Sequence, residues 1–304
     1  MEKEQENSYH KININWYPGH MVKTKRQILE DLKLVDIVVE LLDARIPVSS
    51  QNPDIKEIVG NKKRIVLLNK CDLADAKESQ KWVKDFASKG VKAVLTDSNS
   101  GAGVQELIRV VKEMAREDLN EIAKKGRVGK SVRIMILGIP NVGKSSLINR
   151  ISKKTSAGVG NKPGFTKQKQ WIRVSDEIEL LDTPGILWPK FESEEVGLHL
   201  SVTGTIKDEI LEKTEIAFYL VKWLLANKEE ALLQRYKMSK EEIRQIKENT
   251  PNVNEQIVEV IDQIAKKRGA ILSGGYTDEE RVANIIIDDF RTGKMGRITI
   301  ETVK

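Results

Sequence analysis

The sequence predicts an α/β fold, in which a parallel sheet with helices on both faces is followed by a smaller, all-helical domain. Three features of the 304 residues predict it. Short apolar runs rich in β-branched residues alternate with helix-like segments as far as residue 181. One of these runs leads through a glycine-rich turn directly into a helical segment, at 132–153. Beyond residue 190, helical periodicity continues without strand-like runs of comparable strength.

The apolar runs are short and lie between turn signals and helices, which favours strands. The expected strands are 35–42, 64–68, 93–96, 132–137, 170–174 and 178–181. The expected helices around them include 23–34, 77–89, 104–124 and 144–153. Because parallel strands need a crossover connection, which is usually a helix, this alternation is typical of a parallel sheet.

The last part of the chain is predicted to be helical, with helices at 210–225, 228–236, 239–247, 254–268 and 277–291. We therefore expect three regions. They are a disordered tail at 1–12, a sheet domain at 13–193 and a helical domain at 194–304. A basic, glycine-interrupted linker at 124–130 is expected to join two halves of the sheet domain.

The composition is that of an ordinary soluble protein, with 39% hydrophobic and 32% charged residues. No apolar run approaches the roughly 18 residues that span a bilayer, so no membrane association is expected. The first eleven residues carry three glutamates, unlike a secretory signal or a transit peptide. The single cysteine, Cys71, excludes an internal disulfide and a cysteine-based zinc site. We expect a cytoplasmic, monomeric protein.

Positive charge is concentrated in one segment. Between Ile122 and Ser175 there are thirteen Lys and Arg and no Asp or Glu, although the formal net charge of the whole chain is only +6. Such an excess suits a polyanion, which is a nucleotide phosphate, RNA or both, and DNA is not expected. The alternative is a set of solvated loops with this composition by chance.

The turn at 138–145, GIPNVGKS, matches the phosphate-binding pattern G-x-x-x-x-G-K-[ST] at every fixed position. It lies between an expected strand and an expected helix, where main-chain amides at a helix N-terminus can surround a phosphate. The expected phosphate contacts are Asn141, Val142, Gly143, Lys144, Ser145 and Ser146. The Lys144 ammonium is expected to reach the β- and γ-phosphates, and the Ser145 hydroxyl to ligate Mg²⁺.

Two further groups are expected around the phosphates. Asp182 opens the string DTPG at the end of the expected strand 178–181 and can hold Mg²⁺ through its water shell. The Gly185 amide of the same string can reach the γ-phosphate. Thr166, in the loop between these motifs, is expected to complete the Mg²⁺ coordination, although a lone Thr in a loop is usually a turn residue.

The string NKCD at 69–72 follows the expected strand 64–68 and points to guanine. The Asp72 carboxylate can accept two hydrogen bonds from guanine, and adenine offers no such pair of donors. The Lys70 stem can cover the base, and Asn69 can tie this loop to the turn at 138–145. Ser98 and Asn99 follow the next strand, in a turn that can present an amide to guanine O6.

The order of these motifs is unusual, because the base-reading strings precede the phosphate-binding turn. Together with WYPGHM at 16–21 and DARIP at 43–47, this order resembles the circularly permuted ribosome biogenesis GTPase A family along nearly the whole chain. The resemblance implies a circularly permuted P-loop GTPase domain that binds GTP or GDP. It also implies a bacterial enzyme that acts late in large ribosomal subunit assembly, is stimulated by the ribosomal particle and contacts ribosomal RNA.

The group that positions the attacking water is not obvious, since Ile186 occupies the place of the glutamine in Ras-like enzymes. The resemblance points to His20 as the substitute, and a histidine that only caps a turn is the alternative. Asn141 lies where related GTPases hold a monovalent cation. We hypothesise that K⁺ there stabilises the transition-state charge; as the alternative, Asn141 is a turn residue.

The helical domain is expected either to be a generic cap or to bind RNA. The candidate phosphate contacts are Lys266, Lys267, Arg268, Arg291, Lys294 and Arg297. Two other functions stay open: an RNA-binding protein that uses GTP mainly as a structural ligand, and a GTPase that acts on another RNA.

Overall fold

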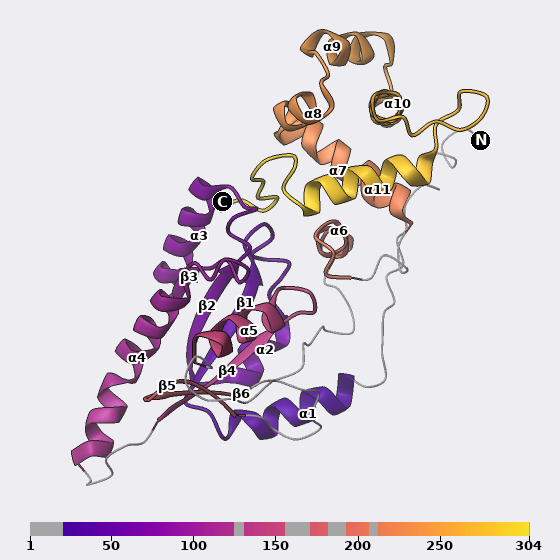
Figure 1. Cartoon of the computed structure of the whole chain (residues 1–304). Coiled ribbons are helices and arrows are strands. Elements are labelled where there is room, and N and C mark those ends of the chain that lie inside the picture. The colour runs from indigo at the N-terminus through magenta and orange to yellow at the C-terminus, as the bar shows by residue number, and fades with distance from the viewer. Residues whose placement is uncertain (1–20, 125–130, 156–170, 182–192, 207–211, 304) are drawn as a thin grey trace. The chain divides into compact units, whose positions relative to one another are not determined.

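The computed structural model describes residues 21–124, 131–155, 171–181, 193–206 and 212–303 (Figure 1). These residues form two compact units. One contains the described residues up to 181 together with 299–303, and the other contains residues 193–206 and 212–298. The expected tail at 1–12 lies outside the described residues, and the domain boundaries at 13, 193 and 194 remain predictions.

The first unit is built on one six-stranded sheet with the strand order β3-β2-β1-β4-β6-β5. Its strands are β1 (Ile37–Asp43), β2 (Lys63–Asn69), β3 (Lys92–Leu95), β4 (Val132–Gly138), β5 (Trp171–Ser175) and β6 (Ile178–Leu181). All neighbours are parallel except β5 and β6, which are antiparallel. The expected parallel sheet is therefore present, except that its last strand pair is antiparallel. Only Asp176 and Glu177 join the two strands, and so short a connection permits a hairpin but no crossover.

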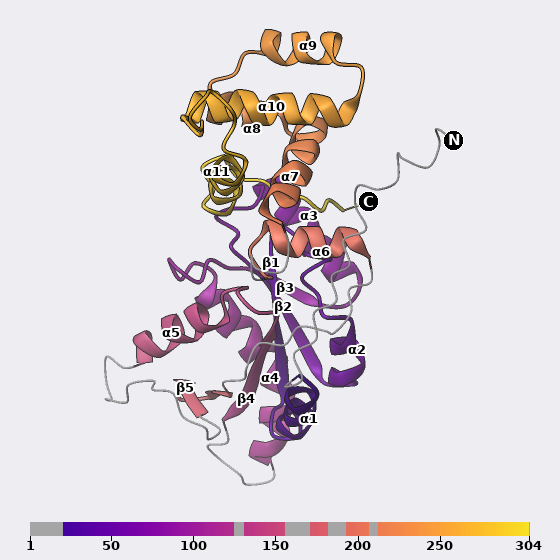
Figure 2. The same cartoon turned by 90° about the vertical axis from the view of Figure 1, so that its right-hand side faces the viewer.

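Helices cover both faces of the sheet. They are α1 (Met21–Leu32), α2 (Pro53–Val59), α3 (Ala76–Ser88), α4 (Val104–Lys124) and α5 (Lys144–Thr155). Ile28 and Leu32 of α1 share a core cluster with Val38 of β1 and Leu181 of β6. Figure 2 shows α2 and α5 on opposite sides of the sheet.

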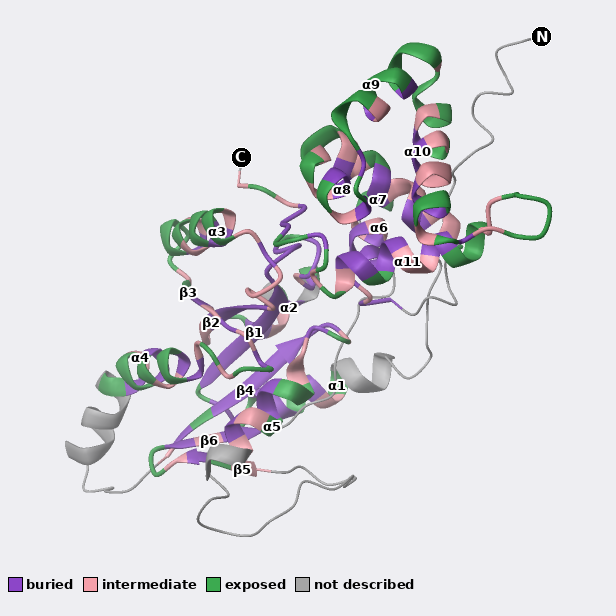
Figure 3. Ribbon diagram, turned by 45° about the horizontal axis from the view of Figure 1, so that its top comes forward, coloured by how far each residue is buried: buried purple, intermediate pink, exposed green. Residues whose placement is uncertain are grey.

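The central strand β1 is buried along its whole length (Figure 3). Apolar burial on both faces is expected of a parallel strand between two helical layers. Glu40 is the charged exception in the middle of the strand, and its carboxylate lies 3.0 Å from Arg64 Nε on β2. The register of β1 places Asp43 beside Asn69 of β2, and Leu41 beside Gly138 of β4.

Residues 299–303, named here the C-terminal strap, pack against the sheet unit. The main-chain amide of Ile300 donates to the carbonyl of Arg45 at 2.8 Å. Trp82 Nε1 of α3 donates to the carbonyl of Glu301 at 2.8 Å. Val303 packs on the core cluster that contains Trp82 and Phe86. The chain end therefore belongs structurally to the loops that follow β1 and β2.

The second unit is helical in its described residues. Its helices are α6 (Glu194–Val202), α7 (Lys213–Asn227), α8 (Glu229–Tyr236), α9 (Lys240–Asn249), α10 (Val253–Arg268) and α11 (Glu279–Arg291). The central helix α7 packs against α6, α8, α10 and α11 and buries Ile216, Leu220 and Leu224. Asp289 of α11 is buried and accepts hydrogen bonds from Arg235 at 2.7 and 2.8 Å.

Two short helices, α2 and α6, were not predicted. Helix α2 has 7 residues and begins at Pro53, and α6 has 9 residues with Gly197 inside it. Segments of this length show too few turns for a clear helical period. None of the described helices is at once long enough and apolar enough to cross a membrane.

Candidate nucleotide-binding site

The turn at 138–145 connects the end of β4 to the start of α5. Only glycine fits at position 138, since a Cβ there would lie 2.9 Å from the carbonyl oxygen of Leu41. Asn141 and Gly143 have left-handed backbone conformations, with φ of 57° and 105°. The first turn of α5 carries no acidic residue. The N-terminal amides of this helix and Lys144 therefore form a site that fits an anion.

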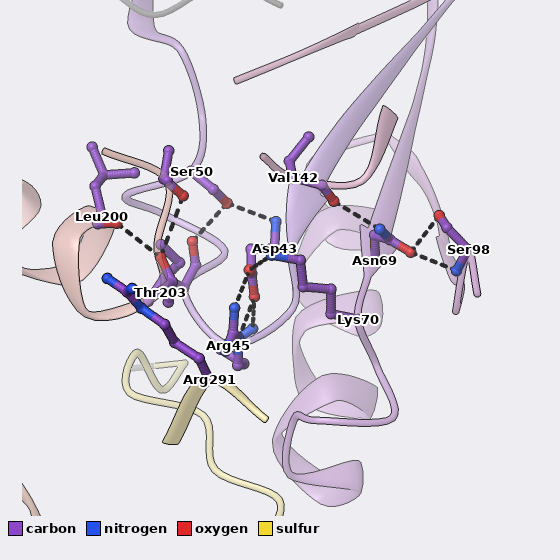
Figure 4. Close-up of polar contacts among 12 residues, drawn as sticks. Asp43, Arg45, Ser50, Asn69, Lys70, Ser98, Val142, Leu200, Thr203 and Arg291 are labelled. Atoms are coloured by element: carbon purple, nitrogen blue, oxygen red, sulfur yellow. Dashed lines mark hydrogen bonds and ion pairs between the residues drawn. The ribbon is translucent and has the colours of Figure 1, made fainter. Parts of the chain in front are cut away.

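Asn69 joins the loops that follow three strands. Its side chain is buried, and Nδ2 donates to the main-chain carbonyl of Val142 at 2.7 Å (Figure 4). Its Oδ1 accepts from the amide of Ser98 at 3.0 Å and from Ser98 Oγ at 2.8 Å. The hydrogen bond proposed from the sequence, from Asn69 to the turn at 138–145, is therefore present.

The fit between Asn69 and the turn leaves no room for a larger residue at 143. A Cβ on Gly143 would lie 2.3 Å from Asn69 Nδ2. The second fixed glycine of the motif thus serves both the backbone conformation and the approach of Asn69.

Lys70 and Asp72 lie in the loop after β2. Lys70 has φ of 58°, and its Nζ lies 3.1 Å from the carboxylate of Asp43. Asp72 is partly exposed, and its carboxylate has no hydrogen-bond or ion-pair partner among the residues that the structure describes. This carboxylate is therefore available to accept hydrogen bonds from a base.

The loop after β3 is held by Asp97 and by Arg150. The Asp97 carboxylate accepts from the amides of Asn99 and Ser100 at 2.8 and 3.2 Å. Burial raises the pKa of Asp97, but hydrogen bonds from Ser100 and Asn99 outweigh it and hold this pKa below its ordinary value. Arg150 of α5 donates to the carbonyl of Asn99. Both amides expected to reach guanine O6, those of Ser98 and Asn99, thus already have acceptors within the protein.

Three residues in this region had no individual role in the sequence interpretation beyond the resemblance and the count of basic residues. Asp43 and Arg45 form a buried pair beside Lys70, and Arg150 links α5 to the loop after β3. No local pattern announces such contacts, because they depend on the register of neighbouring strands.

Several expected site residues lie outside the described part of the chain: His20, Thr166, Asp182, Gly185 and Ile186. Of the expected Mg²⁺ ligands, Ser145 alone is described, and it is exposed in the first turn of α5. Its hydroxyl is a hard oxygen donor of the kind that Mg²⁺ prefers, so it fits such a site. Elsewhere in the described ranges, no three His, Cys, Asp or Glu side chains are grouped so as to hold a metal.

The loops that follow β2, β3 and β4 meet at the carboxyl ends of these strands. The strand order changes direction there, between β1 and β4. In open α/β sheets, ligands bind at the carboxyl ends of the strands at such a point. Asn69 is thus in contact with the loops that follow β3 and β4.

Comparison with known proteins agrees with this geometry. Residues 133–265 match the family model described as "50S ribosome-binding GTPase". Ribosome biogenesis GTPase A of Bacillus pumilus is 45% identical over 290 residues, which cover 95% of this chain and 99% of that protein. Ribosome biogenesis GTPase A of Thermotoga maritima is 31% identical over 288 residues, which cover 95% of this chain and 94% of that protein.

The same relationship is found among solved structures. A GDP-bound structure of YlqF from T. maritima superposes with a TM-score of 0.60 at 28% identity, and covers 91% of this chain and 99% of that chain. These matches confirm the resemblance and the fold class inferred from the motifs, a permuted P-loop GTPase domain with a helical C-terminal region. The chain therefore belongs to the ribosome biogenesis GTPase A family and is a GTPase.

Proposed function

We propose that this GTPase acts as a switch in late assembly of the large ribosomal subunit, with that subunit and its ribosomal RNA as partners. The names of its relatives and of the matching family model support a ribosomal partner. The buried Asn69 bridge carries the nucleotide part of the proposal, because it joins a base-reading loop to a phosphate-binding loop.

Guanine is read by the loops after β2 and β3. Asp72 accepts two hydrogen bonds from the base, and the Lys70 stem covers one face of it. Asn69 and Ser98 hold the two loops together. The Asn99 amide reaches guanine O6 by turning from the Asp97 carboxylate that accepts it at 2.8 Å in this structure.

The phosphates lie over the turn at 141–146. Amides of this turn and the Lys144 ammonium neutralise the β- and γ-phosphate charge. Ser145, Thr166 and Asp182 would hold Mg²⁺, which would supply further charge stabilisation to the phosphates. The Gly185 amide contacts the γ-phosphate. Asn141 would hold K⁺, which would stabilise the transition-state charge as an arginine finger does. Equal hydrolysis rates in K⁺ and Na⁺ would exclude this role.

Hydrolysis depends on a partner, because Ile186 cannot orient water through a hydrogen bond. His20 supplies that group when the enzyme is bound to the ribosomal particle. The expected result is that His20→Ala abolishes particle-stimulated turnover and leaves GTP affinity unchanged. Undiminished stimulation in this variant would remove His20 from the mechanism.

Fewer basic residues of the helical unit are available to bind RNA than the sequence suggests. Lys267 pairs with Glu242 at 2.9 Å, and Lys294 lies 3.6 Å from Asp289. Arg291 donates to the carbonyl of Ser201 at 2.6 Å, and Arg268 to that of Arg235 at 3.1 Å. These candidate phosphate contacts are engaged within the unit. Lys266 and Arg297 are exposed and are the better candidates for an RNA contact.

Two measurements test the function. GTP turnover is measured with and without large-subunit particles, and sedimentation with those particles is followed with a non-hydrolysable GTP analogue. Stimulation and nucleotide-dependent co-sedimentation are expected. Binding without any stimulation would instead favour an RNA-binding protein with GTP as a structural ligand, an alternative for which Ile186 is the argument. Co-sedimentation with another RNA alone would point to a different substrate particle.

A further inference from the structure

The carboxylate of Asp43 lies at the end of β1 and binds two cations in the protein interior. Its side chain has no exposed surface. Arg45 donates from Nη2 to Oδ2 at 2.7 Å and from Nε to Oδ1 at 2.9 Å. Lys70 Nζ lies 3.1 Å from the same Oδ2 (Figure 4). Burial raises the pKa of this carboxyl, but the charges of Arg45 and Lys70 outweigh it, and the pKa lies well below its ordinary range.

The position of Asp43 in the sheet links it to the proposed nucleotide site. It is paired in register with Asn69, the residue that bridges the base-reading and phosphate-binding loops. On its other side, Leu41 of β1 is paired with Gly138, where the phosphate-binding turn begins. Asp43 therefore lies at the end of the strand between the two strands that lead into these loops.

Neutralising the charge of the Asp43 carboxylate does not by itself explain why Lys70 lies beside it. Arg45 already forms a two-pronged pair with Asp43, which is a favourable geometry for a buried carboxylate. Lys70 is a second cation, and its left-handed backbone, with φ of 58°, costs free energy in a residue with a Cβ. The ion pair with Asp43 fixes the far end of a side chain that has many rotamers in solution.

We infer that Asp43 is a positioning residue for guanine recognition, because it anchors the Lys70 ammonium so that the Lys70 stem is held across the face of the base. This inference rests on the proposed function, in which Lys70 and Asp72 bind guanine. Asp43 itself does not touch the nucleotide. Its effect on guanine binding must therefore pass through Lys70.

The test is a double-mutant cycle, read out as GDP affinity from titration with a fluorescent GDP analogue. Lys70→Met keeps an apolar stem and removes the ammonium, whereas Asp43→Asn keeps the shape and removes the anchor. Each is expected to weaken GDP binding about tenfold, the equivalent of one lost interaction. The double variant is expected to be no weaker than Lys70→Met alone. Lys70→Arg, which keeps the cation, should retain most of the affinity.

Asp43→Asn leaves the buried Arg45 guanidinium without its counter-ion, and an uncompensated buried charge lowers the stability of the fold. The second variant Asp43→Asn/Arg45→Met removes both charges and is expected to fold and to show the same tenfold loss. Arg45→Met alone keeps the pair between Asp43 and Lys70 and should bind GDP as the unmodified protein does. Glu40→Gln is the matched control, since it breaks another buried pair of β1, with Arg64, away from Lys70.

The outcomes separate the inference from the proposed function. If Lys70→Met binds GDP normally, anchoring of the ammonium is not needed and the positioning role is overturned. If Asp72→Asn leaves the preference between GDP and XDP unchanged, the proposed guanine site itself is wrong. If Lys70→Met weakens binding but both Asp43 variants do not, the guanine site stands and the positioning role is overturned. A further loss on adding Asp43→Asn to Lys70→Met would also overturn it, because Asp43 would then act independently of Lys70.

Discussion

Asn69 Nδ2 donates to the main-chain carbonyl of Val142 at 2.7 Å, across 73 positions of the sequence. The donor lies in the motif that comes first in the chain and the acceptor in the phosphate-binding turn that comes later. The two motifs are thus in direct contact although their order in the chain is permuted.

Asn69→Asp tests this contact with almost no change in side-chain size. The variant cannot donate to Val142, and it sets a carboxylate oxygen against that carbonyl in a buried position. We expect GTP and GDP affinity to fall and the sheet unit to lose about 2 kcal/mol of stability, as for a buried polar group left unpaired. Thermal unfolding and nucleotide titration measure the two effects. Asn227→Asp is the control, because Asn227 makes the same type of bond, to the Trp223 carbonyl at 2.8 Å, in an exposed position. Equal effects of the two substitutions would contradict the role of Asn69.

Gly143→Ala is expected to abolish nucleotide binding. The added Cβ would lie 2.3 Å from Asn69 Nδ2, and the alanine would also be strained at φ of 105°. Gly90→Ala separates these causes, because Gly90 has φ of 74° and no atom within 4 Å of the position that a Cβ would occupy. It should cost only about 1 kcal/mol of backbone strain and leave GDP affinity unchanged. Normal binding by the Gly143 variant would show that the turn can move away from Asn69.

The elements that could be predicted from the sequence are those whose pattern is local and long. Helix α4 has the expected bounds, 104–124, since its amphipathic period runs over several turns, and β6 has the expected bounds, 178–181. The helices α2 and α6 were missed because each is short and contains Pro or Gly. The antiparallel edge could have been recognised, since two residues cannot form a parallel crossover.

The candidate site divides in the same way. The motifs at 69–72 and 138–145 can be recognised in the sequence, because surrounding a phosphate or reaching a base requires residues at a fixed local spacing. The partners of these strings are not local. Asp43 meets Lys70 because β1 and β2 pair in a particular register, and Arg150 meets Asn99 because α5 packs near the loop after β3. Only the folded chain brings such residues together.

Asp72→Asn is expected to change the preferred base. The Asp72 carboxylate accepts hydrogen bonds, whereas an asparagine amide also donates. Xanthine has a carbonyl where guanine has its exocyclic amine, so the variant should favour XDP over GDP. A shift of at least about tenfold in the ratio of the two affinities is expected, because a mismatched buried pair is strongly rejected. Competition of XDP and GDP for a fluorescent nucleotide measures it, and an unchanged ratio would remove Asp72 from base recognition.

Asp289→Asn is expected to destabilise the helical unit more at neutral pH than in acid. Burial raises the pKa of Asp289, but hydrogen bonds and charge from Arg235 outweigh it and depress this pKa. A depressed folded pKa means that the stabilisation is complete above the unfolded value of about 4 and is lost as the pH falls below it. Thermal unfolding should show a loss of ~2–3 kcal/mol at pH 7 that shrinks toward pH 3. Asp288→Asn, at the exposed neighbouring position, is the matched control and should change the stability little. A pH-independent loss for Asp289→Asn would show that packing, and not charge, is responsible.

Glu301→Ala is expected to release the C-terminal strap. The Glu301 carboxylate accepts from the amide of Val48 at 2.5 Å and from that of Ser49 at 3.0 Å, and also from Ser49 Oγ. Without the Glu301 carboxylate, the amides of Val48 and Ser49 and the Ser49 hydroxyl lose a charged acceptor. We expect this loss to lower the stability of the sheet unit by about 2 kcal/mol. Thermal unfolding and proteolysis near residue 48 measure the effect. Thr302→Ala, at the exposed next position of the strap, is the control and should change neither stability nor proteolysis.

Because the strap also holds the Arg45 carbonyl at 2.8 Å, we expect Glu301→Ala to weaken GDP binding as well, by less than Asp43→Asn does. Full retention of stability would mean that the contacts of Ile300 and Trp82 are enough to keep the strap in place.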